Sequence, residues 1–280
     1  MNWELEIIGA RAGSPDRFGP ASGYLLKTDA ATILVDCGPG VIGQLAARDR
    51  LDDVDAVIIS HRHLDHSGDL MAYAYHLAFP DLRTPIPMFG PTGFSGYVAQ
   101  LDDVHGIPTL PTLQRPVTQM LPLTEVTPGD TFEVHGLRVD TVAALHPVPT
   151  MSMSFPDLGL VYTADTALTP ELTKLASNTD LLLSEATYVD SAGRDILTHG
   201  HMSGVEAGQL AADSGASRLV LTHLSRAEDA EATRETATRH FDGDLSLASA
   251  GKRFLVRDGE ITAVAAAPAH AGAGTDRGDH

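Results

Sequence analysis

The sequence predicts a single α/β domain, and three observations support this fold class. The chain has 280 residues, of which 43% are hydrophobic, which is ordinary for a globular protein with a sizeable core. The predicted strands fall in two groups along the chain, and helices follow each group. No stretch of linker-like composition separates the groups. We therefore expect one domain over residues 1–264 and a small, polar, flexible tail over residues 265–280.

The first group of strands is predicted from short apolar runs that end at turns. These runs cover residues 4–8, 23–36 and 55–60, and "TDAA" inside the second is typical of a hairpin turn. Residues 67–79 follow as a helix that Pro80 ends. Residues 80–130 are rich in proline and threonine, and only "PIPMFGPTG" is predicted there, as a strand and a turn.

The second group alternates strands with helices. Strands are expected at 132–145, 158–165, 180–185 and 217–223. Helices are expected at 169–177, 203–215 and 227–241. Thr169 suits the cap of the first of these helices, and Ser203 with Glu206 forms a capping box for the second. Residues 252–264 close the domain as a hairpin that turns at Asp258-Gly259.

Charge and cysteine content narrow the classes of partner. The formal net charge is −18, from 19 basic and 37 acidic residues, so the surface repels polyanions and long nucleic acids are not expected as partners. No apolar run approaches the roughly 20 residues of a membrane span, and the first residues lack the features of a signal peptide. Cys37 is the only cysteine, which fits a reducing compartment. We therefore expect a cytoplasmic protein without a membrane partner.

The stretch "SHRHLDHSGD" concentrates metal-ligand residue types directly after a predicted buried strand. His61 and His63 are two residues apart, so an extended backbone directs both rings the same way. Asp65 and His66 follow where the chain turns into a helix. This arrangement suits two neighbouring metal ions, one held by each pair. Each ion needs more ligands, because such sites usually take at least three protein groups.

Other candidate ligands each follow an apolar strand. His146 ends "VDTVAALH", Asp165 ends "LGLVYTAD" and His223 ends "SRLVLTH", while Asp36 ends "ATILVD". Taken singly, a polar residue at a strand end is more often structural than functional. Strand ends on one side of a sheet are nevertheless where functional groups gather in α/β folds. Together with the histidine cluster, these residues predict a metal site.

These motifs resemble the metallo-β-lactamase fold family. "HRHLDH" matches its H-x-H-x-D-H signature, and "LVDCGPG", His146, "TADTA" and "LTHLS" follow the family order over about residues 4–264. The resemblance implies a four-layer αββα sandwich with a dinuclear site at one edge. It also implies that two divalent ions, most simply zinc with manganese or iron as alternatives, activate a bridging hydroxide as the nucleophile. The implied ligands are His61, His63 and His146 for the first ion, Asp65, His66 and His223 for the second, and Asp165 for both. Asp36 is implied to orient a ligand.

Two further segments resemble the tRNase Z-like phosphodiesterase branch of this family. "LLLSEATY" and "THGHMSG" are similar to its "HEAT" and "HST" motifs, whose Glu and His protonate the leaving group. Those positions fall here on Glu185 and His201, with Asp65 as the further catalytic candidate. His199 is the alternative proton donor. Ser184 stands where the motif has histidine, and "HMS" replaces "HST", so the match is incomplete.

The resemblance favours a small substrate. Enzymes that process tRNA carry a long arm between the positions of His146 and Asp165, and the 19 positions from one to the other leave no room for it. The remaining similarity is to small-molecule members, including a cyclic-phosphate phosphodiesterase of phosphonate breakdown and actinobacterial proteins similar to cyclic-nucleotide phosphodiesterases. "GPASGYLL" and "HMSGVEAG" are similar to the latter group.

Four functions are compatible with these motifs. The leading hypothesis is a dinuclear metal-dependent hydrolase of a small phosphodiester, such as a cyclic nucleotide. The second is a metal-dependent hydrolase of a lactone, thioester or amide. The third is iron-dependent oxidation of thiol compounds on the same fold. The fourth is a non-enzymatic binding protein, which the complete ligand set disfavours. A homodimer is left open by the sequence.

Overall fold

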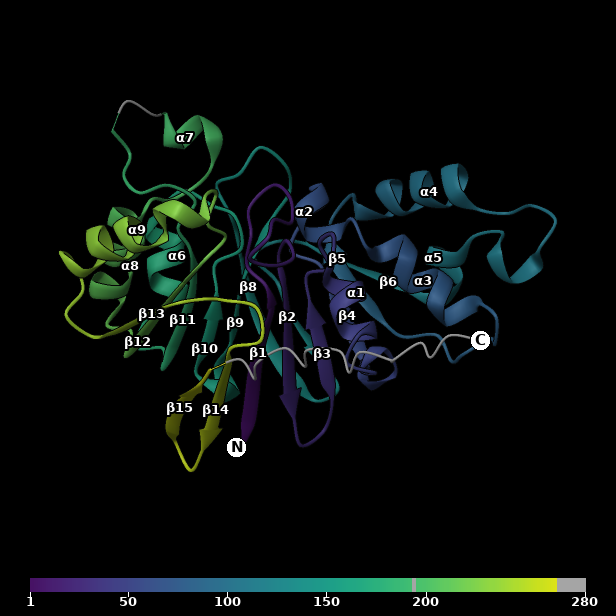
Figure 1. Ribbon diagram of the computed structural model, residues 1–280, viewed down its shortest axis with the longest axis horizontal. Coiled ribbons are helices and arrows are strands. Elements are labelled where there is room, and N and C mark those ends of the chain that lie inside the picture. Colours follow the sequence, from purple (N-terminus) through teal and green to yellow (C-terminus); the bar gives the residue numbers. More distant parts are fainter. Residues whose placement is uncertain (193–194, 266–280) are drawn as a thin grey trace, which may run out of the picture.

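The computed structural model describes residues 1–192 and 195–265. Two β-sheets pack face to face, and helices cover the outer face of each sheet (Figure 1). The apolar residues between the sheets come from both of them, for example Ile7 and Tyr24 of one and Met153 and Leu183 of the other. The predicted α/β class and the αββα sandwich are therefore confirmed.

The first sheet has eight strands in the order β15-β14-β1-β2-β3-β4-β5-β6. Its strands are β1 (Trp3–Gly9), β2 (Gly23–Thr28), β3 (Thr32–Val35), β4 (Ala56–Ile58), β5 (Met88–Pro91), β6 (Leu123–Val126), β14 (Arg253–Arg257) and β15 (Glu260–Val264). The strands β3 to β6 run parallel to one another, so their carboxyl ends meet at one edge of the sheet. That edge carries Asp36 after β3 and the histidine cluster after β4.

The second sheet has seven strands in the order β13-β12-β11-β10-β9-β8-β7. Its strands are β7 (Thr131–Val134), β8 (Leu137–Ala143), β9 (Met151–Phe155), β10 (Leu160–Tyr162), β11 (Leu181–Glu185), β12 (Arg218–Thr222) and β13 (Asp244–Leu247). The strands β10 to β13 are parallel, so the residues that follow β10, β11 and β12 share an edge. Asp165, Glu185 and His223 lie at or just after these three strand ends.

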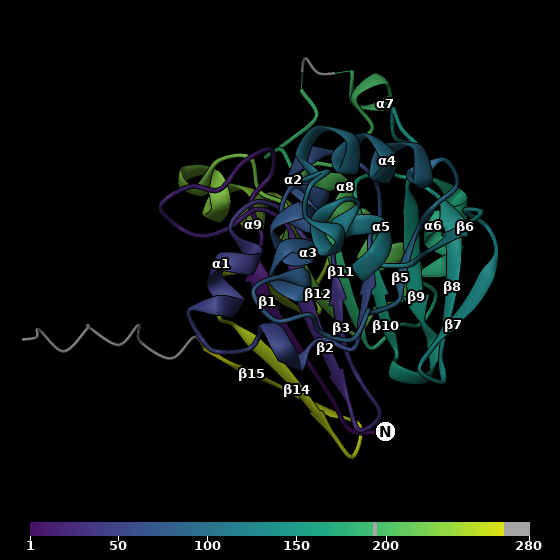
Figure 2. The same ribbon diagram turned by 90° about the vertical axis from the view of Figure 1, so that its right-hand side faces the viewer.

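Helices form the two outer layers. They are α1 (Val41–Ala46), α2 (Leu64–Ser67), α3 (Leu70–Ala78), α4 (Phe94–His105), α5 (Pro116–Met120), α6 (Pro170–Leu175), α7 (Ile196–His199), α8 (Gly204–Ser214) and α9 (Ala230–Thr238). Apolar residues of α1, α3, α4 and α5 pack on the first sheet, on the side that Figure 2 faces. Residues of α6, α8 and α9 pack on the second sheet. Short 3-10 helices lie at Leu51–Asp53, Pro111–Leu113, Pro156–Leu158 and Ala227–Asp229.

Several local predictions are confirmed. Thr169 caps α6 by accepting a hydrogen bond from the N–H of Leu172, and Ser203 and Glu206 form the capping box of α8. The hairpin of β14 and β15 turns at Asp258-Gly259 as predicted. Every helix of residues 1–192 and 195–265 is too short or too polar to cross a bilayer. Most of the tail expected at 265–280 lies outside the described residues.

Three predicted elements differ from the structure. The helix expected at 67–79 is α3, which begins only at Leu70 after a turn at residues 68–69, and Ser67 belongs to the preceding helix α2. The strand expected at 132–145 is the hairpin of β7 and β8, which turns at His135-Gly136 with positive φ at both residues. Residues 80–130 also contain α4, α5 and β6, which their proline and threonine content concealed.

Candidate metal centre

The predicted ligands come together at the edge of the sandwich where the two sets of parallel strands end. His61, His63, Asp65 and His66 follow β4 from the first sheet. From the second sheet, His146 follows β8, Asp165 follows β10 and His223 follows β12. This placement agrees with the rule that functional groups of α/β proteins lie beyond the carboxyl ends of the strands. The cluster contains two groups that could each hold a metal ion, and Asp165 belongs to both.

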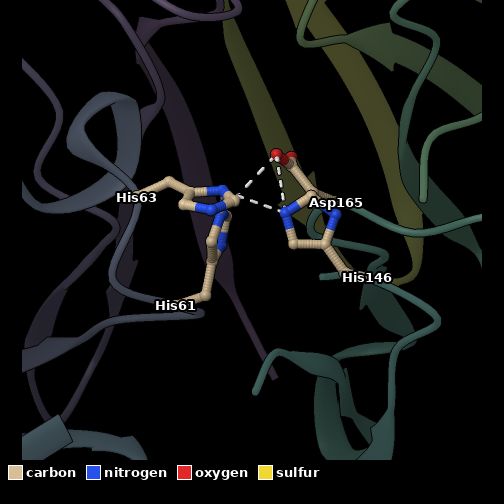
Figure 3. Close-up of side chains that lie close together, drawn as sticks. All are labelled: His61, His63, His146 and Asp165. Carbon is tan, nitrogen blue, oxygen red and sulfur yellow. Dashed lines mark hydrogen bonds and ion pairs between the residues drawn. The ribbon is translucent and has the colours of Figure 1, made fainter. Parts of the chain in front are cut away.

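The first group is built from three imidazoles and one carboxylate (Figure 3). Nδ1 of His63 lies 3.1 Å from Nε2 of His61 and 3.0 Å from Nε2 of His146. Oδ2 of Asp165 lies 3.6 Å from Nε2 of His61. A proton on Nδ1 of His63 can form a hydrogen bond to only one of these two neighbouring nitrogens, so hydrogen bonding does not explain both short distances. Two nitrogens on one tetrahedral zinc ion are about 3.3 Å apart, so this spacing fits a shared cation.

The second group is built from two imidazoles and two carboxylates. Nε2 of His223 lies 3.1 Å from Oδ2 of Asp65 and 3.2 Å from Nε2 of His66. Oδ1 of Asp165 lies 3.2 Å from Nε2 of His66 and 3.4 Å from Nε2 of His223. All four side chains are buried. Their donor atoms therefore converge in the same manner as in the first group.

Asp165 joins the two groups through its separate carboxylate oxygens. Oδ2 faces His61, and Oδ1 faces His66 and His223. Although Oδ1 is fully buried, it accepts no hydrogen bond from the described residues. A buried carboxylate oxygen without a donor is costly, and a cation on each side would satisfy it. The donor set and this oxygen thus fit two divalent ions bridged by Asp165.

The opposite ring nitrogens hold each imidazole in its orientation. Nδ1 of His66 lies 2.7 Å from Oδ2 of Asp36, and Nδ1 of His61 lies 3.1 Å from the hydroxyl of Ser60. Nδ1 of His146 lies 2.9 Å from the carbonyl oxygen of Gly200. Such contacts leave the other nitrogen free to face a metal and raise its basicity. His63 is the exception, because it presents Nδ1 to the cluster.

Burial and neighbouring charges set the protonation states of the predicted ligands. Burial lowers the pKa of His61, His63 and His146, so these rings are neutral donors at neutral pH. Burial alone would lower the pKa of His66, but the Asp165 and Asp36 carboxylates outweigh it and raise that pKa well above its usual value. Burial alone would raise the pKa of Asp165, but the surrounding imidazoles hold it well below its usual range. Asp165 is therefore an ionised carboxylate.

Glu185 and His201 lie beside the second group. Nδ1 of His201 is 3.1 Å from Oε1 of Glu185, which is fully buried and also accepts a hydrogen bond from the N–H of Thr166. Burial alone would lower the pKa of His201, but the Glu185 carboxylate raises it to about 9. With His223 these two residues could also form a third cation-binding group. The proton held by His201 favours an acid–carboxylate pair instead.

His199 does not reach this cluster in the same way. It is the last residue of α7 and is exposed, and its backbone N–H bonds to the carbonyl oxygen of Asp195. His201 makes ring contacts with His146 at 5.1 Å and with His223 at 5.5 Å between centroids. Of the two candidate proton donors, the structure therefore brings only His201 to the predicted ligands.

Some residues of the site were not singled out from the sequence. The hydroxyl of Thr187 lies 2.7 Å from Oε2 of Glu185 and 2.9 Å from Nδ1 of His223, so it joins the acid pair to a predicted ligand. The N–H of Gly13 donates to Oδ2 of Asp65 at 2.6 Å, and the hydroxyl of Tyr162 donates to Asp36 at 2.7 Å. Gly13 and Tyr162 carry no motif, because a backbone N–H and a lone hydroxyl leave no pattern of spacing. Thr187 has a signal, because it is the last residue of the "SEAT" segment that resembles "HEAT".

Comparison with known proteins assigns the family. A model of the beta-lactamase superfamily domain matches residues 31–224, and the chain belongs to this superfamily. It is 28% identical over 260 residues to the probable metallo-hydrolase YhfI of Bacillus subtilis, covering 89% of this chain and 98% of that protein. The crystal structure of YhfI matches with a TM-score of 0.78 at 26% identity, over 91% of this chain and 99% of YhfI.

Relatives also lie in the predicted branch of the superfamily. A ribonuclease Z of Myxococcus xanthus is 26% identical over 298 residues, covering 88% of this chain and 95% of that enzyme. The crystal structure of a diphosphatase of the PhnP family shares the fold, with a TM-score of 0.68 at 16% identity over 91% of this chain and 98% of that one. The resemblance to the tRNase Z-like branch is thereby confirmed.

Proposed function

We propose that this protein is a dinuclear metal-dependent phosphodiesterase that acts on a small phosphodiester, such as a cyclic nucleotide. One observation carries the proposal. A charged pair, Glu185 and His201, lies against a cluster that can hold two cations. Two cations suit a phosphodiester because they stabilise both the attacking and the leaving oxygens of an in-line displacement. The relative named ribonuclease Z supports the same class of bond.

In this proposal, each group of the site has a separate role. His61, His63 and His146 would hold the first ion, Asp65, His66 and His223 would hold the second, and Asp165 would contribute to both sets. When bound, the two ions supply Lewis acidity and an activated water at neutral pH. Zinc is our proposed metal, because imidazole and carboxylate donors in groups of this size are typical of zinc sites, and manganese or iron remain alternatives.

His201 is the proposed proton donor. Phosphodiester hydrolysis expels an alkoxide, which needs a proton unless it is already a weak base. The Glu185 carboxylate holds the proton on His201 at neutral pH, and the hydroxyl of Thr187 and the N–H of Thr166 hold Glu185 in place. Asp65 acts through the metal, with the Gly13 N–H fixing the position of its carboxylate.

The proposed substrate is small. The residues between His146 and Asp165 form β9, a 3-10 turn and β10, so no arm projects there. The net charge of −18 also opposes a long polyanion.

Hydrolysis of a lactone, thioester or amide, and iron-dependent thiol oxidation, remain outcomes of the test below. We propose a cytoplasmic enzyme without a membrane partner.

A substrate panel tests this proposal. Metal-analysed protein reconstituted with zinc or manganese is assayed on bis(p-nitrophenyl) phosphate, on 2′,3′- and 3′,5′-cyclic nucleotides, and on lactone, thioester and amide substrates. Metal-dependent turnover of the phosphodiesters is expected, and Asp65→Ala should abolish it while circular dichroism shows a retained fold. Full activity in Asp65→Ala would contradict the role of this residue. Turnover of the other esters alone would assign a different class of hydrolase.

A further inference from the structure

Two buried tyrosines reach in opposite directions between the two sheets, next to the candidate metal centre. Tyr24 lies on β2 of the first sheet and Tyr162 on β10 of the second, and both belong to the core between the sheets. Their rings contact each other, with centroids 5.0 Å apart and an angle of 60° between the planes. A phenol hydroxyl buried in an apolar core needs a hydrogen-bond partner. Each tyrosine finds this partner on the opposite sheet.

Tyr162 reaches from the second sheet to the first. Its hydroxyl donates to Oδ2 of Asp36, the residue after β3, at 2.7 Å. The same oxygen lies 2.7 Å from Nδ1 of His66. Asp36 is fully buried and has a φ of +60°, a left-handed conformation that is unfavourable for a residue other than glycine. Tyr162 therefore stabilises a strained residue that orients a predicted ligand of the second ion.

Tyr24 reaches from the first sheet to the second. Its hydroxyl shares a hydrogen bond of 2.8 Å with the hydroxyl of Thr222, the last residue of β12. Thr222 is fully buried and precedes His223, whose φ of +56° is also left-handed. Nε2 of His223 lies 3.2 Å from Nε2 of His66. The two tyrosines thus support, from opposite sheets, two predicted ligands of the same ion.

The second ion needs such support because its two imidazoles come from different sheets. Apolar packing holds the sheets together, but it is non-directional and does not by itself fix how the sheets are placed at one edge. Metal ligands must be held within about 0.5 Å of their working positions. Hydrogen bonds have a preferred length and direction. A hydrogen bond from each sheet to the other therefore fixes the relative position of His66 and His223.

We propose that Tyr24 and Tyr162 are positioning residues for the second ion, and that they act by fixing the placement of the two sheets at His66 and His223. Each acts through a neighbouring residue, Tyr162 through Asp36 and Tyr24 through Thr222. The proposal rests on the proposed function for the presence of the second ion, and it is independent of the substrate.

A metal-binding experiment tests the proposal without turnover. Tyr24→Phe and Tyr162→Phe keep the ring and remove the hydroxyl. Metal-free protein is titrated with zinc in competition with a chromophoric chelator, and the binding step that is lost in Asp65→Ala identifies the second site. Each tyrosine variant should lower the zinc affinity of that site about 2- to 10-fold, the value of one hydrogen bond. Unchanged second-site affinity in either variant would overturn the proposal.

The first site provides an internal comparison. Its ligand His146 is oriented by the carbonyl oxygen of Gly200. The zinc affinity of the first site, identified by the binding step that is lost in His146→Ala, should therefore change less than twofold in both tyrosine variants. The visible spectrum of the cobalt-substituted protein should change only in the part that depends on the second ion. Equal losses at both sites would overturn a role specific to the second ion.

Tyr73→Phe is the matched control for the loss of a buried hydroxyl. Tyr73 is fully buried in the layer of helices outside the first sheet, and its hydroxyl donates to the carbonyl oxygen of Leu51 at 3.1 Å. This variant should leave both zinc affinities unchanged, while thermal unfolding followed by circular dichroism measures its stability beside that of the other two. If Tyr73→Phe weakens the second site as much as Tyr24→Phe does, general destabilisation is the cause and the proposal is wrong.

A second pair of variants tests the partner of Tyr24. Thr222→Val has nearly the same shape as threonine but no hydroxyl, so it should weaken the second site as Tyr24→Phe does. Thr222→Ser keeps the hydroxyl and should retain most of the zinc affinity. Equal second-site affinities in Thr222→Val and Thr222→Ser would show that the hydrogen bond to Tyr24 does not position His223.

The two proposals fail in different ways. If the wild-type protein binds two ions and hydrolyses no phosphodiester, but the tyrosine variants weaken the second site, the proposed function is wrong and the positioning role stands. If the wild-type protein hydrolyses phosphodiesters with two ions and the tyrosine variants leave the second site unchanged, the proposed function stands and the positioning role is wrong. A wild-type protein that binds only one ion would overturn both.

Discussion

Nδ1 of His146 lies 2.9 Å from the carbonyl oxygen of Gly200, the residue before His201. A predicted ligand of the first metal and the proposed proton donor are thus held by one short piece of backbone. Gly200 has a φ of +64°, and a Cβ on it would lie 2.6 Å from the Leu145 carbonyl oxygen and 2.7 Å from Cα of His146. Both are backbone atoms that cannot rotate away. Only glycine therefore fits this close approach.

Gly200→Ala should weaken metal binding at the first site. The added methyl pushes residue 200 away from His146 and breaks the contact that orients its ring. Loss of such an orienting contact typically lowers metal affinity 10- to 100-fold. Competition with a chromophoric chelator measures the affinity, and the visible spectrum of the cobalt-substituted protein reports the ligand geometry.

Gly259→Ala is the matched control for that variant. Gly259 has a similar φ of +83°, but apart from its chain neighbours no atom of the described residues lies within 4 Å of the position that a Cβ would take there. It carries the same backbone strain, about 1–2 kcal/mol, without the clash. Metal affinity should be unchanged in Gly259→Ala. Equal loss in both variants would mean that strain alone, and not the contact with His146, is responsible.

His201→Ala should affect substrates according to their leaving group. An alkyl phosphodiester needs a proton on its leaving oxygen, so its kcat should fall by about 10²- to 10⁴-fold. Bis(p-nitrophenyl) phosphate expels a weakly basic phenolate and should lose far less. His199→Ala, at the exposed end of α7, should affect neither. Equal losses on both substrates in His201→Ala would rule out a general acid role.

The pH profile should report the charge of His201. The Glu185 carboxylate raises the pKa of His201 to about 9, so the acid form is present below that pH and is lost as the pH rises through it. Bound cations oppose a charged imidazole, so the midpoint should lie at or below about 9. The kcat/KM for an alkyl phosphodiester should therefore fall above this midpoint, and Glu185→Gln should move the fall to lower pH. If the fall in kcat/KM stays at the same pH in Glu185→Gln, the fall is due to a group other than His201.

Asp36→Asn should weaken the second metal site. Asp36 is fully buried, and its carboxylate accepts hydrogen bonds from the N–H and hydroxyl of Ser60 and from Tyr162, besides contacting His66. An amide must place its own N–H₂ against some of these donors, so His66 loses its orientation. A 10- to 100-fold loss of metal affinity is expected. Tyr162→Phe removes one donor only and should cause a smaller loss.

The sequence predicted the strands that are strongly apolar. It also predicted the turns and helix ends that glycine, serine or threonine mark. The seven predicted ligands come together because they lie on segments that leave the ends of such strands, and parallel strands end at a common edge. The helices α4 and α5 were missed because residues 80–130 are rich in proline and threonine, which favour neither element. Pro116 begins α5, where its missing N–H is harmless, and a Gly93 with φ of +87° precedes α4.

The supporting contacts were harder to predict for a physical reason. The bond from the Gly13 N–H to Asp65 and the bond from His146 to the Gly200 carbonyl oxygen use backbone atoms, which every residue has. The orientation of His63, which presents Nδ1 while its neighbours present Nε2, depends on the local turn before α2. Sequence motifs specify which side chains take part. The close approach of backbone segments that fixes their geometry becomes visible only in three dimensions.

If the proposed function is correct, the clustered ligands bind two ions that act together in phosphodiester hydrolysis. A titration of metal-free protein with zinc measures this cooperation, with bound metal and turnover of bis(p-nitrophenyl) phosphate determined at each step. We expect two ions to bind per chain and activity to reach its maximum only when both are bound. Full activity at one ion per chain, or two bound ions without any phosphodiester turnover, would contradict a dinuclear phosphodiesterase.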